Sequence, residues 1–336
     1  MKLGFKASAE QFAPKDLLDY AVLAEEVGLD SVWVSDHFQP WRHSGGHAPF
    51  SLTWLGALGA RTQRITIGTS VLTPTFRYHP SIVAQAFGTL GSLFPDRVVL
   101  GLGTGESLNE VPASGLEWPE QKERTARFRE AVQLIKALWS GERLNFEGVY
   151  YKTQLATIYD RPAKPVPIFI AAAGPFMAKL AGLQGDGFIC TSGKKWELYV
   201  DTLLPNLAAG LEASGRSQSA DYDKMIELKL SFDTDRQRAL EDTRFWGALA
   251  LTADEKMNVE DPLQLERLAD SLPVERAASR WIVSDDADEV IERIGAYIKL
   301  GFNHLVFHAP GKDQARFLGL FAQHIAPRLR RQFGAA

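Results

Sequence analysis

Short runs rich in β-branched and aromatic residues alternate with longer helical patterns along the chain, and this alternation limits the fold more than any other feature. Eight of these runs are predicted strands: 3–7, 31–35, 65–70, 97–102, 166–171, 187–191, 226–232 and 304–308. Helical patterns fill the gaps between them, for example at 15–27, 121–139 and 313–329. Because each strand is followed by a helix, neighbouring strands should pair in parallel through β-α-β units.

A parallel sheet of eight strands either closes into a barrel or stays open with helices on both faces. Residues of unusual chemistry follow the carboxyl ends of several strands, at 35–37, 70–72, 103–106, 171–174 and 191–194. A barrel places many strand ends around one functional rim, whereas an open sheet gathers them near a single switch point. The length of 336 residues also suits a barrel. We therefore predict an α/β fold of the (β/α)8 TIM-barrel type.

Two segments are longer than a bare barrel requires. Residues 141–165 separate the fourth and fifth units and could form a hairpin, and the charged segment 233–281 follows the seventh strand with mainly helical patterns. Structureless loops of this length are uncommon in compact domains, so both segments should carry structure. No repeat or linker divides the sequence, and we expect a single domain over residues 1–336 with these two insertions.

Composition excludes several classes of protein. The chain has 37 basic and 41 acidic residues, and its net charge of −4 argues against a nucleic-acid partner. Its single cysteine, Cys190, argues against a disulfide scaffold and fits a reducing cytoplasm. No apolar run approaches the roughly 18 residues needed to span a bilayer, and the first residues lack a signal-peptide core. We expect a cytoplasmic protein without a membrane partner, in which an anionic ligand would need a local cluster of basic residues.

Several common motifs are missing or incomplete. Residues 101–106 begin like a dinucleotide fingerprint, but Glu106 occupies the position of its last glycine. The sequence contains no Walker A motif, no His-Glu-x-x-His and no Gly-x-Ser-x-Gly. His43 and His47 flank a Ser-Gly-Gly turn without a third ligand nearby, so we expect no metal site.

Two residues at strand ends are candidates for proton transfer. His37 follows Asp36 at the end of the second strand, and imidazole has an ordinary pKa of about 6.5, which suits acid–base work at neutral pH. A rim histidine bound to a backbone carbonyl is the simpler alternative. Glu106 follows three glycines that would let the backbone approach a ligand closely. A glutamate favoured by a helix dipole is an equally good interpretation of that position.

Four polar residues could together bind a phosphate. Thr191 and Lys194 end the sixth strand, and Lys256 and Arg280 lie in the second insertion. Cations on rim segments of an acidic chain suit a phosphate, which carries roughly −1.5 to −2 charges near pH 7. Each residue alone would more often be a solvated surface group, and the spacing does not show that the four converge.

Six segments of the sequence match a known family: 6–12, 34–43, 68–78, 103–106, 191–194 and 303–311. They closely resemble F420-dependent glucose-6-phosphate dehydrogenases, and the likeness extends over nearly the whole chain. The Asp-His segment and the Ser-Val-Leu-Thr-Pro segment are typical of the wider group of luciferase-like flavin and deazaflavin barrels. The four candidate phosphate residues narrow the resemblance to enzymes that act on sugar phosphates.

The resemblance implies a bacterial-luciferase-like (β/α)8 barrel that usually forms a homodimer. It also implies the cofactor F420, an 8-hydroxy-5-deazaflavin with a phosphate in its tail, which accepts hydride at C5. The implied reaction is oxidation of a sugar 6-phosphate, with glucose 6-phosphate first, at C1 to the 6-phosphogluconolactone.

Individual residues match functional positions of that family. His37 and Glu106 match the catalytic pair, with Trp41 at the reacting centre, and we favour His37 as the base and Glu106 as the acid. The matching cofactor positions are Asp36, Ser70, Val71, Thr73, Thr104, Gly105, Glu106 and Asn109, with a non-proline cis bond expected at Ser70–Val71. The loop for the cofactor's tail phosphate is matched by Ala173, Gly174, Phe176 and Met177. The substrate phosphate ligands are matched by Thr191, Lys194, Lys256 and Arg280.

Two positions depart from the family pattern. Met257 replaces a histidine next to Lys256, which removes a hydrogen-bond donor and makes other substrates, such as mannose or fructose 6-phosphate, plausible. Ala173 replaces a glycine, which is tolerable if its φ angle stays negative. The alternatives are an F420-dependent oxidoreductase for a non-phosphorylated alcohol, an FMN monooxygenase, or a cofactor-binding protein without turnover.

Overall fold

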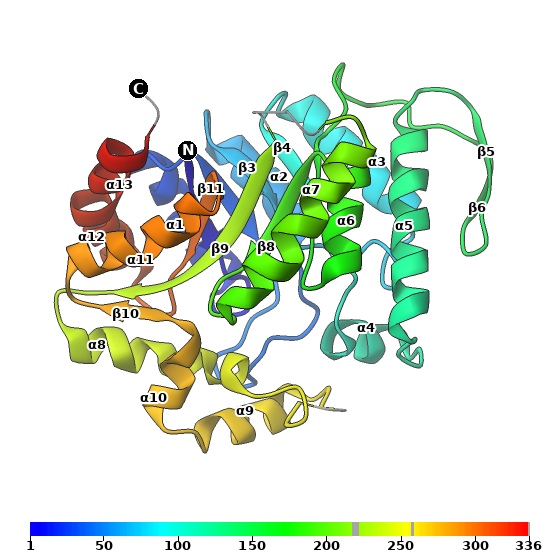
Figure 1. Cartoon of the computed structure of the whole chain (residues 1–336). Coiled ribbons are helices and arrows are strands. Elements are labelled where there is room, and N and C mark those ends of the chain that lie inside the picture. The colour runs from blue at the N-terminus through cyan, green and yellow to red at the C-terminus, as the bar shows by residue number, and fades with distance from the viewer. Residues whose placement is uncertain (217–221, 257–258, 335–336) are drawn as a thin grey trace.

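The computed structural model describes residues 1–216, 222–256 and 259–334, and over these ranges eight parallel strands close into a barrel surrounded by helices (Figure 1). The barrel strands are β1 (Lys2–Ala7), β2 (Ser31–Val34), β3 (Thr66–Thr69), β4 (Val98–Leu102), β7 (Ile168–Ala171), β8 (Gly187–Thr191), β9 (Asp223–Phe232) and β11 (His304–His308). Pairing of β8 with β9, of β9 with β11 and of β11 with β1 closes the barrel. The predicted (β/α)8 fold is confirmed.

Helices cover the outside of the barrel. They are α1 (Pro14–Glu26), α2 (Ser51–Arg61), α3 (Pro80–Leu93), α5 (Gln121–Leu138), α6 (Pro175–Gln184), α7 (Leu204–Ala213), α11 (Ala287–Lys299), α12 (Gln314–Leu320) and α13 (Ala326–Phe333). The sequence of α11 explains its position, because Val290, Ile291 and Ile294 form one buried stripe, whereas charged residues such as Glu292 are exposed. The Asp286 side chain caps this helix by accepting from the backbone N–H of Asp288 at 2.8 Å.

The interior of the barrel is filled by side chains. Trp33 is completely buried there, stacks on Phe169 with 5.5 Å between ring centroids, and donates its indole N–H to Ser31 Oγ at 2.9 Å. Val99, Ile189, Met225 and Val306 complete this cluster. The barrel is therefore a packed core, and a ligand site has to lie on the loops at one end of the strands.

The first insertion is an antiparallel hairpin of β5 (Leu144–Glu147) and β6 (Lys152–Ala156), which stands at the edge of the molecule beyond α5 (Figure 1). Its turn is fixed to α5 because the Glu130 carboxylate accepts the backbone N–H groups of Val149, Tyr150 and Tyr151 at 3.0, 2.8 and 2.7 Å. The hairpin expected within 141–165 is confirmed.

The second insertion is helical, as predicted, and lies across the same end of the barrel as α4 (Ser107–Ser114) (Figure 1). It contains α8 (Arg236–Glu241), a 3-10 segment (Asp242–Ala250), α9 (Pro262–Asp270), α10 (Val274–Ala277) and a 3-10 turn (Ala278–Arg280). Arg42, in the loop after β2, binds Asp270 at 2.6 Å and Glu266 at 3.1 Å. The insertion is thereby joined to the loop that carries His37 and Trp41.

One strand was not predicted. β10 (Ile282–Ser284) follows the second insertion and pairs in parallel with the last residues of β9. A run of three residues is too short to give a periodic signal in the sequence.

Within the described residues, no helix combines the length and apolar character that crossing a bilayer requires.

Replacement of Trp33 by alanine tests the packed interior. Because Trp33 is fully buried, Trp33→Ala should leave a cavity and lower the free energy of unfolding by about 3–5 kcal/mol in urea titrations. Tyr159→Ala is the matched control, since this aromatic side chain is 88% exposed, and it should change stability little. Equal effects of the two substitutions would contradict a packed barrel interior.

Candidate active site

The loops after β3 and β4 form one side of the rim. The backbone N–H of Leu72 donates to the carbonyl of Gly101 at 2.9 Å, and that of Gly103 donates to the carbonyl of Leu72 at 3.0 Å. The expected cis peptide bond at Ser70–Val71 is present. These contacts bring the predicted cofactor positions of the two loops together at the carboxyl ends of the strands.

His37 is held by three groups at this rim. Its Nε2 lies 3.2 Å from Glu10 Oε1, and its Nδ1 lies 3.1 Å from the Gln39 carbonyl and 3.2 Å from Asn109 Nδ2. The Trp41 ring lies nearby, with 5.8 Å between ring centroids. The imidazole is therefore oriented and has a carboxylate partner, which is the arrangement that general acid–base chemistry requires.

Glu10 was not identified from the sequence. It follows the end of β1 by three residues, is buried, and accepts from Ser35 Oγ at 2.5 Å. Burial alone would raise the pKa of this carboxyl, but the charges of His37 and Lys6 and the Ser35 hydrogen bond outweigh it and lower the pKa. An acidic residue just after the first strand, on the same rim as the other candidates, was the available signal.

Asn109 and Asp36, both predicted cofactor positions, are engaged with the protein itself. Asn109 Oδ1 accepts the backbone N–H groups of Phe38 and Gln39 at 2.9 and 3.1 Å, which fixes the loop that follows His37. The Asp36 carboxylate is buried and binds Ser51 Oγ at 2.6 Å, Arg77 at 2.7 Å and the Tyr78 hydroxyl at 3.0 Å. Both side chains thus stabilise the loops at the rim through hydrogen bonds within the protein. Their contact with a cofactor stays a prediction.

The predicted phosphate residues of β8 meet Arg280 of the second insertion. Gly193 has φ +73°, and a Cβ atom there would lie 2.3 Å from the Arg280 carbonyl oxygen, so only glycine allows this approach. The Arg280 guanidinium donates to the carbonyls of Ser192 at 3.2 Å and Leu249 at 3.3 Å. Thr191, Lys194 and Arg280 are thus gathered from segments almost 90 residues apart.

The surroundings of Lys194 are strongly positive. Removal from water and the charges of Arg280, Lys256 and Lys229 lower the pKa of the Lys194 ammonium to about 8. Cations are brought this close only at a cost in electrostatic repulsion, which an anionic ligand would relieve.

Lys256 connects this cluster with the candidate catalytic residues. Its ammonium lies 5.4 Å from the centre of the Trp41 ring, a cation–π distance. Partial burial lowers its pKa, and the negative charge of Glu106 acts in the opposite direction. Met257, the departure from the family pattern, lies outside the described residues.

Glu106 is the N-cap residue of α4, as the alternative interpretation of this position expected, yet its side chain makes no capping hydrogen bond. The carboxylate is exposed at the rim. It is therefore available to a ligand as well as to the helix dipole.

The structure offers suitable surroundings for a flat ring and an anionic tail. Gly105 has φ +84°, and a Cβ atom there would lie 2.9 Å from Thr73 Cγ2, so the glycine segment lies directly on the loop after β3. A Cβ atom at Gly174, at the amino end of α6, would meet nothing within 4 Å, and Phe176 is 56% exposed. Backbone N–H groups at a helix start suit an anion.

The other predicted cofactor positions differ in their environment. Thr104 is partly exposed beside the glycine segment. Ala173 is not among the described residues with positive φ, which meets the condition for replacing glycine there. Met177 packs partly against the main hydrophobic core and is less accessible than Phe176.

Lys229 was also missed, although it lies next to the phosphate residues. Its ammonium donates to Thr191 Oγ1 at 2.7 Å and to Glu227 at 2.7 Å. Glu227 and Lys229 alternate with Leu228 and Leu230 along β9, so their side chains point into the barrel. This alternation of charged and apolar residues was the signal in the sequence.

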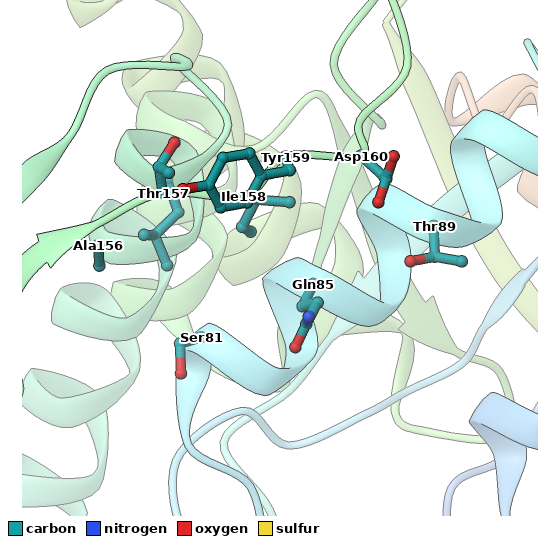
Figure 2. Close-up of a pocket in the computed structure, with 9 residues that line it drawn as sticks. Ser81, Gln85, Thr89, Ala156, Thr157, Ile158, Tyr159 and Asp160 are labelled. Atoms are coloured by element: carbon teal, nitrogen blue, oxygen red, sulfur yellow. The ribbon is translucent and has the colours of Figure 1, made fainter.

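A separate cavity of about 200 Å³ lies outside the barrel, between α3 and residues 156–160 (Figure 2). Ser81, Gln85 and Thr89 of α3 face the segment that contains Tyr159 and Asp160 (Figure 2). None of the predicted site residues lines it. No group of three or more metal-ligating side chains that could hold a metal ion occurs in the described part of the chain.

Comparison with known proteins identifies the family. Residues 1–304 match the family model of luciferase-like monooxygenases. The chain is 65% identical over 334 residues to an F420-dependent glucose-6-phosphate dehydrogenase of Nakamurella multipartita, covering 99% of this chain and 98% of the relative. It is 64% identical over 330 residues to the enzyme of the same name from Beutenbergia cavernae, covering 98% of each.

Solved structures agree with this family. An F420-dependent secondary alcohol dehydrogenase in complex with an F420–acetone adduct is 32% identical, with a TM-score of 0.89, over 96% of this chain and 98% of that chain. The coenzyme F420-dependent tetrahydromethanopterin reductase from Methanopyrus kandleri has a TM-score of 0.79 at 20% identity, over 97% and 99% of the two chains, which supports the fold alone. The chain therefore belongs to the luciferase-like family and, within it, to the family of F420-dependent glucose-6-phosphate dehydrogenases.

Proposed function

We propose that this chain catalyses the F420-dependent oxidation of a sugar 6-phosphate at C1, with glucose 6-phosphate as the principal substrate. The product is the 6-phosphogluconolactone. The observation that carries this proposal is the position of Lys256, whose ammonium contacts the Trp41 ring and belongs to the same cationic cluster as Lys194 and Arg280. A phosphate bound by that cluster would leave the sugar ring beside His37 and Glu106. The names of relatives at 64–65% identity support the same reaction.

His37 is the proposed base. Glu10 and Asn109 orient the imidazole, so that it can remove the proton of the C1 hydroxyl as hydride leaves the same carbon. Coenzyme F420, when bound, supplies the hydride acceptor at its C5 atom. Glu106, whose carboxylate is exposed at the rim, would hold the proton at the N1 side of the cofactor ring.

The residues proposed to hold the cofactor surround the glycine segment and the start of α6. Ser70, Val71, Thr73, Thr104 and Gly105 would lie along the ring. The amino end of α6, with open space at Gly174, would receive the tail phosphate. Thr191, Lys194, Lys256 and Arg280 would bind the phosphate of the sugar.

A homodimer in the cytoplasm is the proposed state of the enzyme. This part of the proposal rests on the family resemblance alone. The molar mass from light scattering of the purified protein tests it, with twice the chain mass of 37.2 kDa expected.

The direct experiment mixes the purified protein with oxidised F420 and follows loss of the cofactor's visible absorbance. Glucose 6-phosphate should cause this loss, whereas glucose should not at equal concentration. Mannose and fructose 6-phosphates measure the breadth of specificity, and 2-propanol tests the second candidate function suggested by the secondary alcohol dehydrogenase. Turnover with 2-propanol and with no hexose 6-phosphate would overturn the proposal.

Substitution of His37 tests the proposed base. His37→Ala should lower kcat by about 10²- to 10⁴-fold, because a positioned general base is lost. The affinity for F420, measured by its fluorescence, should stay within about twofold, as a proton-transfer group adds little to ground-state binding. His43→Ala is the matched control, since this histidine is exposed on the same loop, and kcat should not change. A His37→Ala enzyme that keeps most of the wild-type kcat would instead favour a protein that binds F420 without catalysing turnover.

The depressed pKa of Lys194 predicts a pH dependence of substrate binding. The ammonium is protonated below about pH 8 and neutral above it, so the KM for glucose 6-phosphate should rise as pH increases from 7 to 9.5. The phosphate ester stays doubly charged over this range, since its second pKa is about 6. The arginine of Lys194→Arg stays protonated over this pH range, so the part of the KM increase that comes from Lys194 should disappear in this variant. Identical KM profiles for the two proteins would show that Lys194 does not bind the phosphate.

A further inference from the structure

A cluster of titratable side chains lies inside the barrel next to the proposed phosphate site. Lys6 of β1, Glu227 and Lys229 of β9, and His308 of β11 form it, and these strands are neighbours in the order β9-β11-β1. Glu227 lies 3.3 Å from the Lys6 ammonium, 2.7 Å from that of Lys229 and 3.4 Å from His308 Nδ1. The Lys229 side chain is only 4% exposed. The reaction described above uses none of these residues.

The contact between Lys229 and Thr191 fixes the direction of a hydrogen bond. An ammonium group can only donate, so Thr191 Oγ1 accepts from Lys229 at 2.7 Å. The hydroxyl of Thr191 keeps its own hydrogen, and no acceptor for it is found among the described residues. Thr191 is partly exposed at the end of β8, so this hydrogen is free to point toward a ligand. Lys229 thereby makes Thr191 a donor toward whatever occupies the rim.

The charges within the cluster act on one another. Two lysines share one carboxylate, and although burial would raise the pKa of Glu227, the charges of Lys229 and Lys6 outweigh it and hold the pKa well below its usual range. Burial lowers the pKa of His308, and the contact with Glu227 acts in the opposite direction. Lys229 is thus a buried cation that shares the Glu227 carboxylate with Lys6 and uses the Thr191 hydroxyl as a further acceptor.

We propose that Lys229 is a positioning residue for the phosphate of the substrate. It aligns the Thr191 hydroxyl as a donor to a phosphate oxygen, so that a phosphate ester is preferred over a neutral sugar. This inference rests on the proposed function. A purely structural role, in which Lys229 only neutralises Glu227, is the alternative that an experiment has to separate.

The test combines Lys229→Met, Thr191→Val and the double variant. Lys229→Met should raise the KM for glucose 6-phosphate about 10-fold or more, the effect of losing a hydrogen bond to a charged group. The kcat and the affinity for F420 should stay within about threefold of the wild-type values. The lost interaction with the phosphate is equally strong in the ground state and in the transition state, so its loss raises KM and leaves the chemical step unchanged. In the Thr191→Val background the same substitution should raise KM less than about threefold, since Lys229 acts through Thr191.

Two further variants serve as a partial rescue and as a control. Lys229→Gln retains a donor without the charge, should recover part of the loss, and carries the test if the methionine variant does not fold. Lys2→Met is the matched control: Lys2 pairs with Asp223 at 2.8 Å on the same two strands at the opposite end of the barrel, and its loss should leave KM unchanged.

Calorimetry with inorganic phosphate and the protein without F420 gives a readout that does not depend on turnover. Phosphate should bind the Lys229→Met protein about 10-fold more weakly than the wild type. If the wild type oxidises no hexose 6-phosphate, the proposed function is wrong, and calorimetry still decides the role of Lys229. Unchanged phosphate affinity and KM in a folded Lys229→Met protein, or an equal rise of KM in the Thr191→Val background, would overturn the inference.

Discussion

Repulsion among cations gathered at the carboxyl end of the barrel is the constraint on which the site depends. Lys194, Lys229, Lys256 and Arg280 are close enough for three of them to lower the pKa of the fourth. Glu227 and Glu106 offset part of this charge, and Glu227 is shared by Lys6 and Lys229. Positive charge is therefore concentrated at one place in a protein whose net charge is −4. A bound dianion is the simplest way to offset the repulsion among these cations.

Ion pairs and packing contacts connect this cationic cluster to the residues proposed for proton transfer. Arg42 ties the second insertion to the loop after β2 through Asp270 and Glu266, and Trp41 of that loop packs on an apolar cluster of the insertion. Asn109 holds the adjoining backbone of the loop in place. A phosphate bound by Arg280 would therefore sit at a fixed distance from His37, and fixed separation is what orients a substrate for hydride and proton transfer.

Much of the fold could be predicted from the sequence, because strands buried on both faces are dense in apolar residues and alternate with amphipathic helices. Strand limits were less accurate. The third strand was expected over 65–70 and spans Thr66–Thr69. The seventh strand begins earlier than expected, at Asp223, because that polar residue finds Lys2 and His304 as partners.

The site was predictable only in part. The convergence of Thr191 with Arg280 depends on the Gly193 turn and the path of the second insertion, which no spacing in the sequence reveals. Glu10 and Lys229 were missed because a single charged residue near a strand end is usually a solvated group. Asp36 matched a cofactor position, yet its carboxylate is bound by Ser51, Arg77 and Tyr78, contacts that come from distant segments.

A crystal structure of the protein with F420 and glucose 6-phosphate tests the central claim most directly. We expect the phosphate oxygens within hydrogen-bond distance of Thr191, Lys194, Lys256 and Arg280, with the C1 hydroxyl within hydrogen-bond distance of the His37 imidazole and C1 facing the deazaflavin ring. A phosphate bound elsewhere, with these four side chains in contact only with water, would contradict the account.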